Sequence, residues 1–118
     1  MSTITTRLSH PIRGLLHALK KDRSFQSQFF GGLLAILLLW LVFSPLAIYE
    51  WLFIGLCWTL ILITELQNSA LEEALNNIHP ELNEHIGRSK DMAAGAVLLA
   101  AVYALSTIVA LSIIRFVA

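Results

Sequence analysis

The chain has little charge: only 14% of its 118 residues are Asp, Glu, Lys or Arg, against about 25% in typical soluble domains. Hydrophobic residues make up 57% of the sequence. Too few polar side chains remain to coat a globule of this size, so the surrounding solvent must be lipid. The formal net charge is zero, and no Lys- or Arg-rich run is interleaved with aromatic residues. We therefore expect no nucleic-acid partner.

Cysteine is also nearly absent. Cys57 is the only one, so the chain can form no internal disulfide, and no paired Cys and His spacing indicates a structural zinc site. The histidines do not recur four residues apart, and we interpret each as a surface or interfacial residue. A Walker-type glycine loop is missing, which excludes a P-loop kinase. We also expect no secretory signal, because the first apolar run starts late and lacks a cleavage pattern.

Long apolar stretches predict three membrane-spanning helices that follow a surface helix. We expect a single membrane domain, 1–118, divided as follows: an amphipathic interfacial helix over 1–24, spans over 25–44, 46–78 and 89–117, a cytoplasmic extension at the end of 46–78, and a cytoplasmic loop over 79–88. Pro11 is expected at the first position of the surface helix, and Ser89 as the cap of the last span. Most Lys and Arg residues precede the first span or lie in the loop, with only Arg115 on the other side. The N-terminus and the loop should therefore face the cytoplasm.

The second span ends in a polar stripe. Its members are spaced at helical intervals: Glu65, Asn68, Ser69, Glu72 and Asn76. This spacing places them on one face of one helix. A carboxylate at the hydrocarbon boundary costs roughly 2.5–3.5 kcal/mol and by default marks a function. We interpret the stripe as a site for a proton, a cation, or a metal with its phosphates. The alternative is a helix end whose acids face water.

Other polar groups are expected at the same membrane face. Asp22 precedes the first span, and Lys90 and Asp91 open the third. Asp22 and Glu72 could hold a divalent cation, while Lys90 could bind a phosphate oxygen as a point charge. Glu65, nearest the lipid, could orient or deprotonate a hydroxyl group. Because phosphoryl transfer depends mainly on positioning and charge neutralisation, these few groups are sufficient for it.

These residues resemble the signature of a known family. The resemblance to bacterial diacylglycerol kinases lies in two segments: Glu65-x-x-Asn68-Ser69-Ala70-x-Glu72, and Gly87-Arg88-Ser89-Lys90-Asp91-Met92 at the start of an alanine-rich helix. The likeness in span order and loop position covers nearly the whole chain. It implies an all-α, homotrimeric helix bundle in the bacterial inner membrane, with active sites shared between protomers. It also implies that MgATP phosphorylates a membrane lipid alcohol, usually diacylglycerol and in related members undecaprenol.

The resemblance implies a role for each matching residue. It makes Glu65 the general base, and Asp22 and Glu72 the ligands of Mg²⁺. Nucleotide contacts fall on these positions: Lys90, Asp91, Glu81 and His10. Supporting polar positions are Asn68, Ser69, Asn76 and Gln28.

Three positions depart from the family's pattern. Asp22 stands where the family has a glutamate, and Gln28 and Asn76 stand where it has acids. These changes favour one alternative, a non-catalytic or repurposed relative that keeps the fold. Another alternative is an ion or proton conduit that uses Glu65 as a carrier, which leaves Lys90 without a role. We expect a diacylglycerol kinase rather than an undecaprenol kinase, because the Gly-Arg-x-Lys-Asp-Met pattern resembles the diacylglycerol-specific branch.

Overall fold

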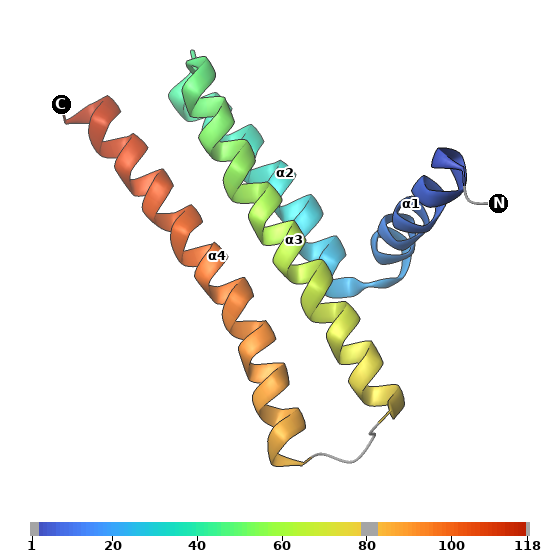
Figure 1. The fold of residues 1–118 in the computed structure, drawn as a ribbon. Coiled ribbons are helices and arrows are strands. Elements are labelled where there is room, and N and C mark those ends of the chain that lie inside the picture. The colour runs from blue at the N-terminus through green and yellow to red at the C-terminus, as the bar shows by residue number, and fades with distance from the viewer. Residues whose placement is uncertain (1–2, 79–82, 118) are drawn as a thin grey trace.

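The computed structural model describes residues 3–78 and 83–117, and this part of the chain is all-helical. Its helices are α1 (Ile4–Lys21), α2 (Arg23–Phe43), α3 (Ile48–Ile78) and α4 (Glu84–Phe116). In Figure 1, α2, α3 and α4 run alongside one another, while α1 projects to one side from the start of α2. α3 is the central element, because both α2 and α4 pack on it, whereas α1 contacts α2.

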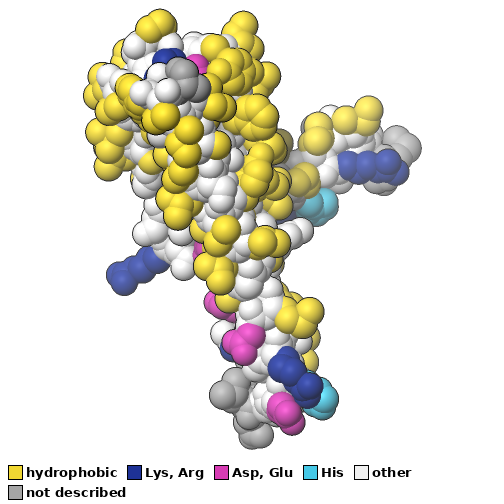
Figure 2. Space-filling model, turned by 90° about the vertical axis from the view of Figure 1, so that its left-hand side faces the viewer, with side chains coloured by type: hydrophobic (Ala, Val, Ile, Leu, Met, Phe, Trp, Pro, Cys, Tyr) yellow, Lys and Arg dark blue, Asp and Glu magenta, His cyan; other side chains and the backbone are white. Residues whose placement is uncertain are grey.

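Three of the described helices are long and apolar enough to cross a membrane: α2 with 21 residues, α3 with 31 and α4 with 33. Most of their large apolar side chains are exposed, among them Leu34, Leu52 and Leu99. A soluble protein would bury such a set. Figure 2 shows hydrophobic side chains covering most of the upper part of the molecule, whereas acidic and basic side chains gather toward its lower end and basic ones also lie on α1. The chain is therefore a multi-pass membrane protein.

The first helix begins earlier than its proline suggests. α1 begins at Ile4, after Thr3, whose hydroxyl oxygen accepts a hydrogen bond from the backbone amide of Thr6 at 3.3 Å. Pro11 lies inside α1, so the prediction that it opens the helix is wrong. Proline lacks the amide that would donate to the carbonyl of Arg7. Because this part of α1 is exposed, water can take the place of that donor.

A single residue, Asp22, joins α1 to α2. Its backbone amide donates to the carbonyl of Ala18 at 3.0 Å and closes α1. Its side-chain Oδ1 accepts from the backbone amides of Ser24 at 3.1 Å and Phe25 at 3.3 Å, which caps the start of α2. The backbone of Asp22 is extended, with φ −96° and ψ 109°. α1 therefore ends at Lys21, three residues before the boundary at residue 24 that the sequence predicts for the surface helix.

α2 and α3 approach each other closely at Gly32. A Cβ atom at this position would clash with Cδ1 and Nε1 of the Trp58 ring, so the absence of a side chain lets the two helices meet. The Trp58 ring nitrogen donates to the backbone carbonyl of Gln28 at 3.4 Å, and its ring centroid lies 5.2 Å from that of Phe29. At the adjacent Gly31, by contrast, a Cβ atom would meet open space.

α4 begins at Glu84, five residues before the Ser89 cap that the sequence predicts. The actual cap is Asn83, whose Oδ1 accepts from the backbone amide of Ile86 at 3.0 Å. Asparagine is as good a cap as serine, and it comes earlier in the chain. The expected loop over 79–88 is therefore too long at its second end, because its last five residues are helical.

Candidate active site

A groove of about 900 Å³ separates α1 from α3. One wall is formed by α1 and the start of α2, and its polar members are His17, Lys21, Asp22 and Ser24. The other wall is formed by α3, and its polar members are Ser69, Glu72, Glu73, Asn76 and Asn77. The groove therefore places part of the predicted polar stripe opposite the predicted acidic group that precedes the first span.

Asp22 is fixed in this groove by its capping role. Both capping hydrogen bonds go to Oδ1. Its other oxygen, Oδ2, has no hydrogen-bond donor among the described residues, so it is available to a ligand in the groove. Glu72 is exposed on the opposite wall. Asp22 on one wall and Glu72 on the other thus bring carboxylates to a shared space, and Glu73 adds a further one on the α3 wall.

Glu65 is buried, with only 6% of its surface exposed. It precedes Glu72 by seven residues, which is about 10 Å along the axis of α3. Glu65 does not line the groove, but three groups of the groove act on its carboxylate. Asp22 and Glu72 repel its negative charge, and the nearby Ser24 hydroxyl favours it. The predicted base and the predicted metal ligands are therefore electrostatic neighbours.

Lys90 connects α4 to the end of the stripe. Its Nζ donates a hydrogen bond to Oδ1 of Asn76 at 2.7 Å, across 14 residues of sequence. Asn76 in turn lines the groove one helical turn beyond Glu72. The ammonium group predicted to bind phosphate is thus held beside the groove by a neutral partner. A neutral amide leaves the positive charge of Lys90 uncompensated.

The remaining predicted residues are more scattered. Asp91, His10 and Gln28 are exposed and do not line the groove. Asn68 is half-buried, and its Oδ1 is buried without a hydrogen-bond donor among the described residues. Glu81 lies outside the described residues. The geometry of the single chain thus gathers the carboxylates and Lys90 but leaves the exposed side chains of His10, Gln28 and Asp91 outside the groove.

The groove offers oxygen ligands of the kind that Mg²⁺ prefers. Within residues 3–78 and 83–117, no three His, Cys, Asp or Glu side chains lie close enough together to hold a metal by themselves. Magnesium ions are usually held by one or two carboxylates together with water and substrate phosphates. The free oxygen of Asp22 and the exposed carboxylate of Glu72 fit that donor set. They would hold Mg²⁺ only together with a phosphate-bearing substrate.

Five polar residues of the groove are missing from the sequence-based predictions: His17, Lys21, Ser24, Glu73 and Asn77. His17 and Lys21 line the wall opposite Glu72, although His17 was predicted only to be a surface or interfacial residue. They are four residues apart on α1, so they share a face of that helix with each other. That spacing, followed to Asp22 at the end of the helix, is the signal that could have indicated a common wall.

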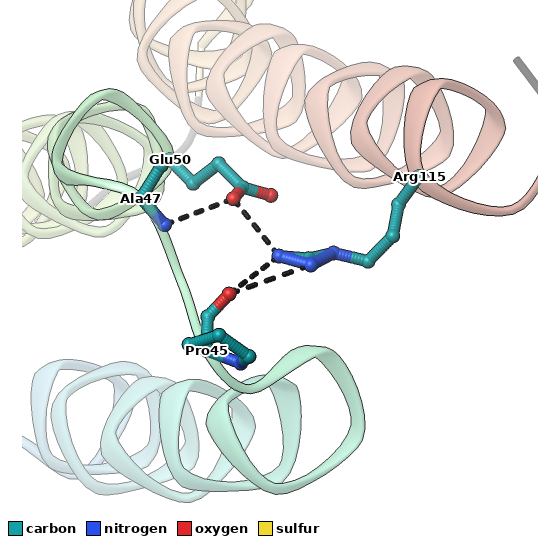
Figure 3. Close-up of polar contacts among 4 residues, drawn as sticks. All are labelled: Pro45, Ala47, Glu50 and Arg115. Atoms are coloured by element: carbon teal, nitrogen blue, oxygen red, sulfur yellow. Dashed lines mark hydrogen bonds and ion pairs between the residues drawn. The ribbon is translucent and has the colours of Figure 1, made fainter.

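A second site, also absent from the predictions, lies at the other end of α3. Glu50 is 4% exposed and pairs with Nη2 of Arg115 at 3.1 Å, and the side chain of Arg115 is 24% exposed. The same Nη2 donates to the carbonyl of Pro45 at 2.7 Å, and the Glu50 carboxylate also accepts from the backbone amide of Ala47 at 3.0 Å. Figure 3 shows how this network joins the turn before α3 to the end of α4. From the sequence, Arg115 contributed only to the predicted orientation in the membrane.

Comparison with known proteins identifies the family. No individual curated protein matches the chain. The family model for prokaryotic diacylglycerol kinase matches residues 9–114. This match covers the groove, Glu65, Glu72 and Lys90, and leaves out only the first eight and the last four of the 118 residues. The chain therefore belongs to the prokaryotic diacylglycerol kinase family, a family of membrane lipid kinases.

Proposed function

We propose that this chain transfers the γ-phosphate of ATP to a membrane lipid alcohol, and that diacylglycerol, which yields phosphatidic acid, is the acceptor. One observation carries the proposal. Asp22 and Glu72 lie on opposite walls of one groove, and their charges act on the buried Glu65. Family membership supplies the class of reaction, and the chemistry of these side chains supplies the roles.

Each group has a distinct task in this proposal. Glu65 accepts the proton of the lipid hydroxyl as the hydroxyl oxygen attacks the γ-phosphorus and the bond to the β-phosphate oxygen breaks, which releases ADP. Asp22 and Glu72 would hold Mg²⁺, which would supply charge neutralisation at the phosphate oxygens. Lys90 binds a phosphate oxygen as a point charge. To make this contact, Lys90 must either give up its hydrogen bond to Asn76 or share its three N–H donors between Asn76 and the phosphate.

The burial of Glu65 supports its role as a base. A carboxylate withdrawn from water is less well solvated, and electrostatic interactions strengthen in such surroundings. The Ser24 hydroxyl can orient it. Since Glu65 lies closer to the apolar body of α3 than Glu72 does, it is the carboxylate that a lipid hydroxyl reaches first.

The wider setting belongs to the same proposal. The basic residues of α1 and of the start of α4 support a cytoplasmic position for the N-terminus and the groove, at the bacterial inner membrane. In this setting α1 lies in the membrane interface, with its exposed Leu8 and Ile12 directed toward lipid. The exposed apolar faces of α2 to α4 serve contacts between protomers of a homotrimer as well as contacts with lipid.

The test is an assay of purified protein in mixed micelles with MgATP and either diacylglycerol or undecaprenol. We expect phosphatidic acid to form and undecaprenyl phosphate to be the minor product. Glu65→Gln should lower kcat by about 10²–10⁴-fold, the usual contribution of a positioned proton acceptor. Glu84→Gln is the matched control, since Glu84 is exposed and, among the described residues, forms an ion pair only with the exposed Arg88, at 3.7 Å.

Three outcomes would change the proposal. Turnover of undecaprenol alone would reassign the acceptor. Activity of Glu65→Gln equal to that of the Glu84→Gln control would remove Glu65 as the base. Absence of turnover with both lipids, in protein that keeps its helical content, would favour the non-catalytic relative, which the amide at Asn76 already suggests.

A further inference from the structure

The antiparallel helices α3 and α4 are tied to each other by polar contacts at both of their ends. Lys90 bonds Asn76 at the end next to the groove, and Arg115 pairs with Glu50 at the opposite end. α4 packs on α3 between these two ties. None of the catalytic roles proposed above involves the Glu50–Arg115 pair.

The spacing of the two ties matches on the two helices. Asn76 follows Glu50 by 26 residues on α3, and Arg115 follows Lys90 by 25 residues on α4. At 1.5 Å per residue, these separations are about 39 and 38 Å. The register that satisfies one tie therefore satisfies the other. A slip of α4 by one residue would move Lys90 by about 1.5 Å along the axis and turn it by about 100°.

The tie at Glu50 is the stronger constraint on this register. Glu50 is almost completely buried, whereas the Lys90–Asn76 hydrogen bond is exposed. Arg115 is also held from two sides, by the Glu50 carboxylate and by the carbonyl of Pro45. A charged pair in a low-dielectric setting tolerates little displacement, because separation leaves each charge without compensation. α4 therefore cannot slide without breaking this network.

We propose that Glu50 and Arg115 are positioning residues, which fix the axial register of α4 on α3 and thereby hold Lys90 beside the Glu72–Asn76 end of the groove. The pair acts at a distance of about 38 Å through two rigid helices. The effect on catalysis rests on the proposed lipid kinase function. The effect on helix register does not, and the two can be measured separately.

The first measurement reports the register without using kinase activity. In a Cys57→Ala background, Asn76→Cys and Lys90→Cys place two thiols at the tie next to the groove. Thiol crosslinkers of graded length then measure the separation of these thiols. The comparison is between protein with an intact Glu50–Arg115 pair, the far pair, and the double variant Glu50→Leu/Arg115→Leu. Replacing a buried ion pair by apolar residues is often neutral or stabilising, so we expect this variant to fold. Helical content and thermal unfolding check this.

We expect the shortest effective reagent to crosslink quickly when the far pair is intact. In the leucine double variant, crosslinking should slow and its optimum should move to longer reagents. Glu84→Gln, which disrupts only the exposed contact with Arg88, should leave the crosslinking pattern unchanged. An identical pattern with and without the far pair would overturn the proposal.

The second measurement is a double-mutant cycle with Lys90→Met. Loss of the far pair should lower kcat/KM for MgATP by up to about 100-fold, the cost that a misplacement near 1 Å can carry. When Lys90 is already replaced, loss of the far pair should cost little more, because the group that it positions is gone. Additive losses would show that the far pair supports only general stability and would overturn the positioning role. A wild-type protein with no lipid kinase activity would refute the proposed function, while the crosslinking result would still decide the register.

Discussion

Replacing Asp22 with asparagine separates its capping of α2 from its proposed role at the metal. The capping bonds from Ser24 and Phe25 both go to one side-chain oxygen, and the asparagine carbonyl can accept both. Asparagine and aspartate are equally good N-caps, whereas alanine costs about 1 kcal/mol, within a range of roughly 0.5–2. We therefore expect Asp22→Asn to keep the stability of the wild type and Asp22→Ala to lose about 1 kcal/mol.

The affinity for Mg²⁺ should not follow the same order as the stability of these variants. Asparagine removes the negative charge at the oxygen that faces the groove, so both variants lose a Mg²⁺ ligand of full charge. Changes that only surround a metal ligand already cost about 10–100-fold in affinity. We expect Asp22→Asn to raise the Mg²⁺ concentration for half-maximal activity by at least about tenfold. The assay is a magnesium titration of kinase activity at fixed ATP, paired with denaturant unfolding in the same micelles.

Asp22→Glu completes the series. It has the residue type that the family resemblance implies, with one more methylene of reach, but glutamate is not among the residues that cap helices well. It should bind Mg²⁺ more tightly than the wild type and unfold more easily. A magnesium titration of Asp22→Asn that matches the wild type would refute the ligand role. Equal unfolding of Asp22→Asn and Asp22→Ala would refute the capping argument.

Two further predictions concern α2 and α3. Gly32→Ala should be about 1–3 kcal/mol less stable than Gly31→Ala, because the new methyl group at residue 32 meets the Trp58 ring and the one at residue 31 meets open space. Denaturant unfolding in one detergent checks this, and equal stabilities would contradict the packing described for Gly32. Glu72→Gln should shift the magnesium titration by at least about tenfold and leave unfolding unchanged, since Glu72 is exposed. An unchanged titration would argue against a ligand role for Glu72.

The sequence was sufficient to predict the helical class and the three spans, because long apolar runs are the strongest local signal in a chain. The polar stripe was also predictable, since its members lie on a single helix and recur at helical spacing. Helix ends were less predictable. Thr3 and Asn83 cap the helices whose starts were predicted at Pro11 and Ser89. Several residues near a helix start can act as its cap, and only the folded backbone selects one of them.

Contacts between helices were the least predictable part. Glu50 and Arg115 are 65 residues apart, and no periodicity links them. The groove wall that His17 and Lys21 form depends on the direction in which α1 leaves α2, which the single extended residue Asp22 determines. The roles of Asp22, Glu65, Glu72 and Lys90 were predicted from their side-chain chemistry, and the family resemblance added roles for the other site residues.

The length of α3 has a consequence for how two reactants of opposite solubility meet. Its 31 residues extend about 46 Å, against a hydrocarbon thickness of about 30 Å. Counted from Ile48, about 20 residues cross the hydrocarbon, so the remaining turns, which carry Glu72 and Asn76, rise into water. A water-soluble phosphate donor can dock on these turns without leaving the aqueous phase. A lipid acceptor needs only to raise its hydroxyl to the level of Glu65, so neither molecule has to enter the other's solvent.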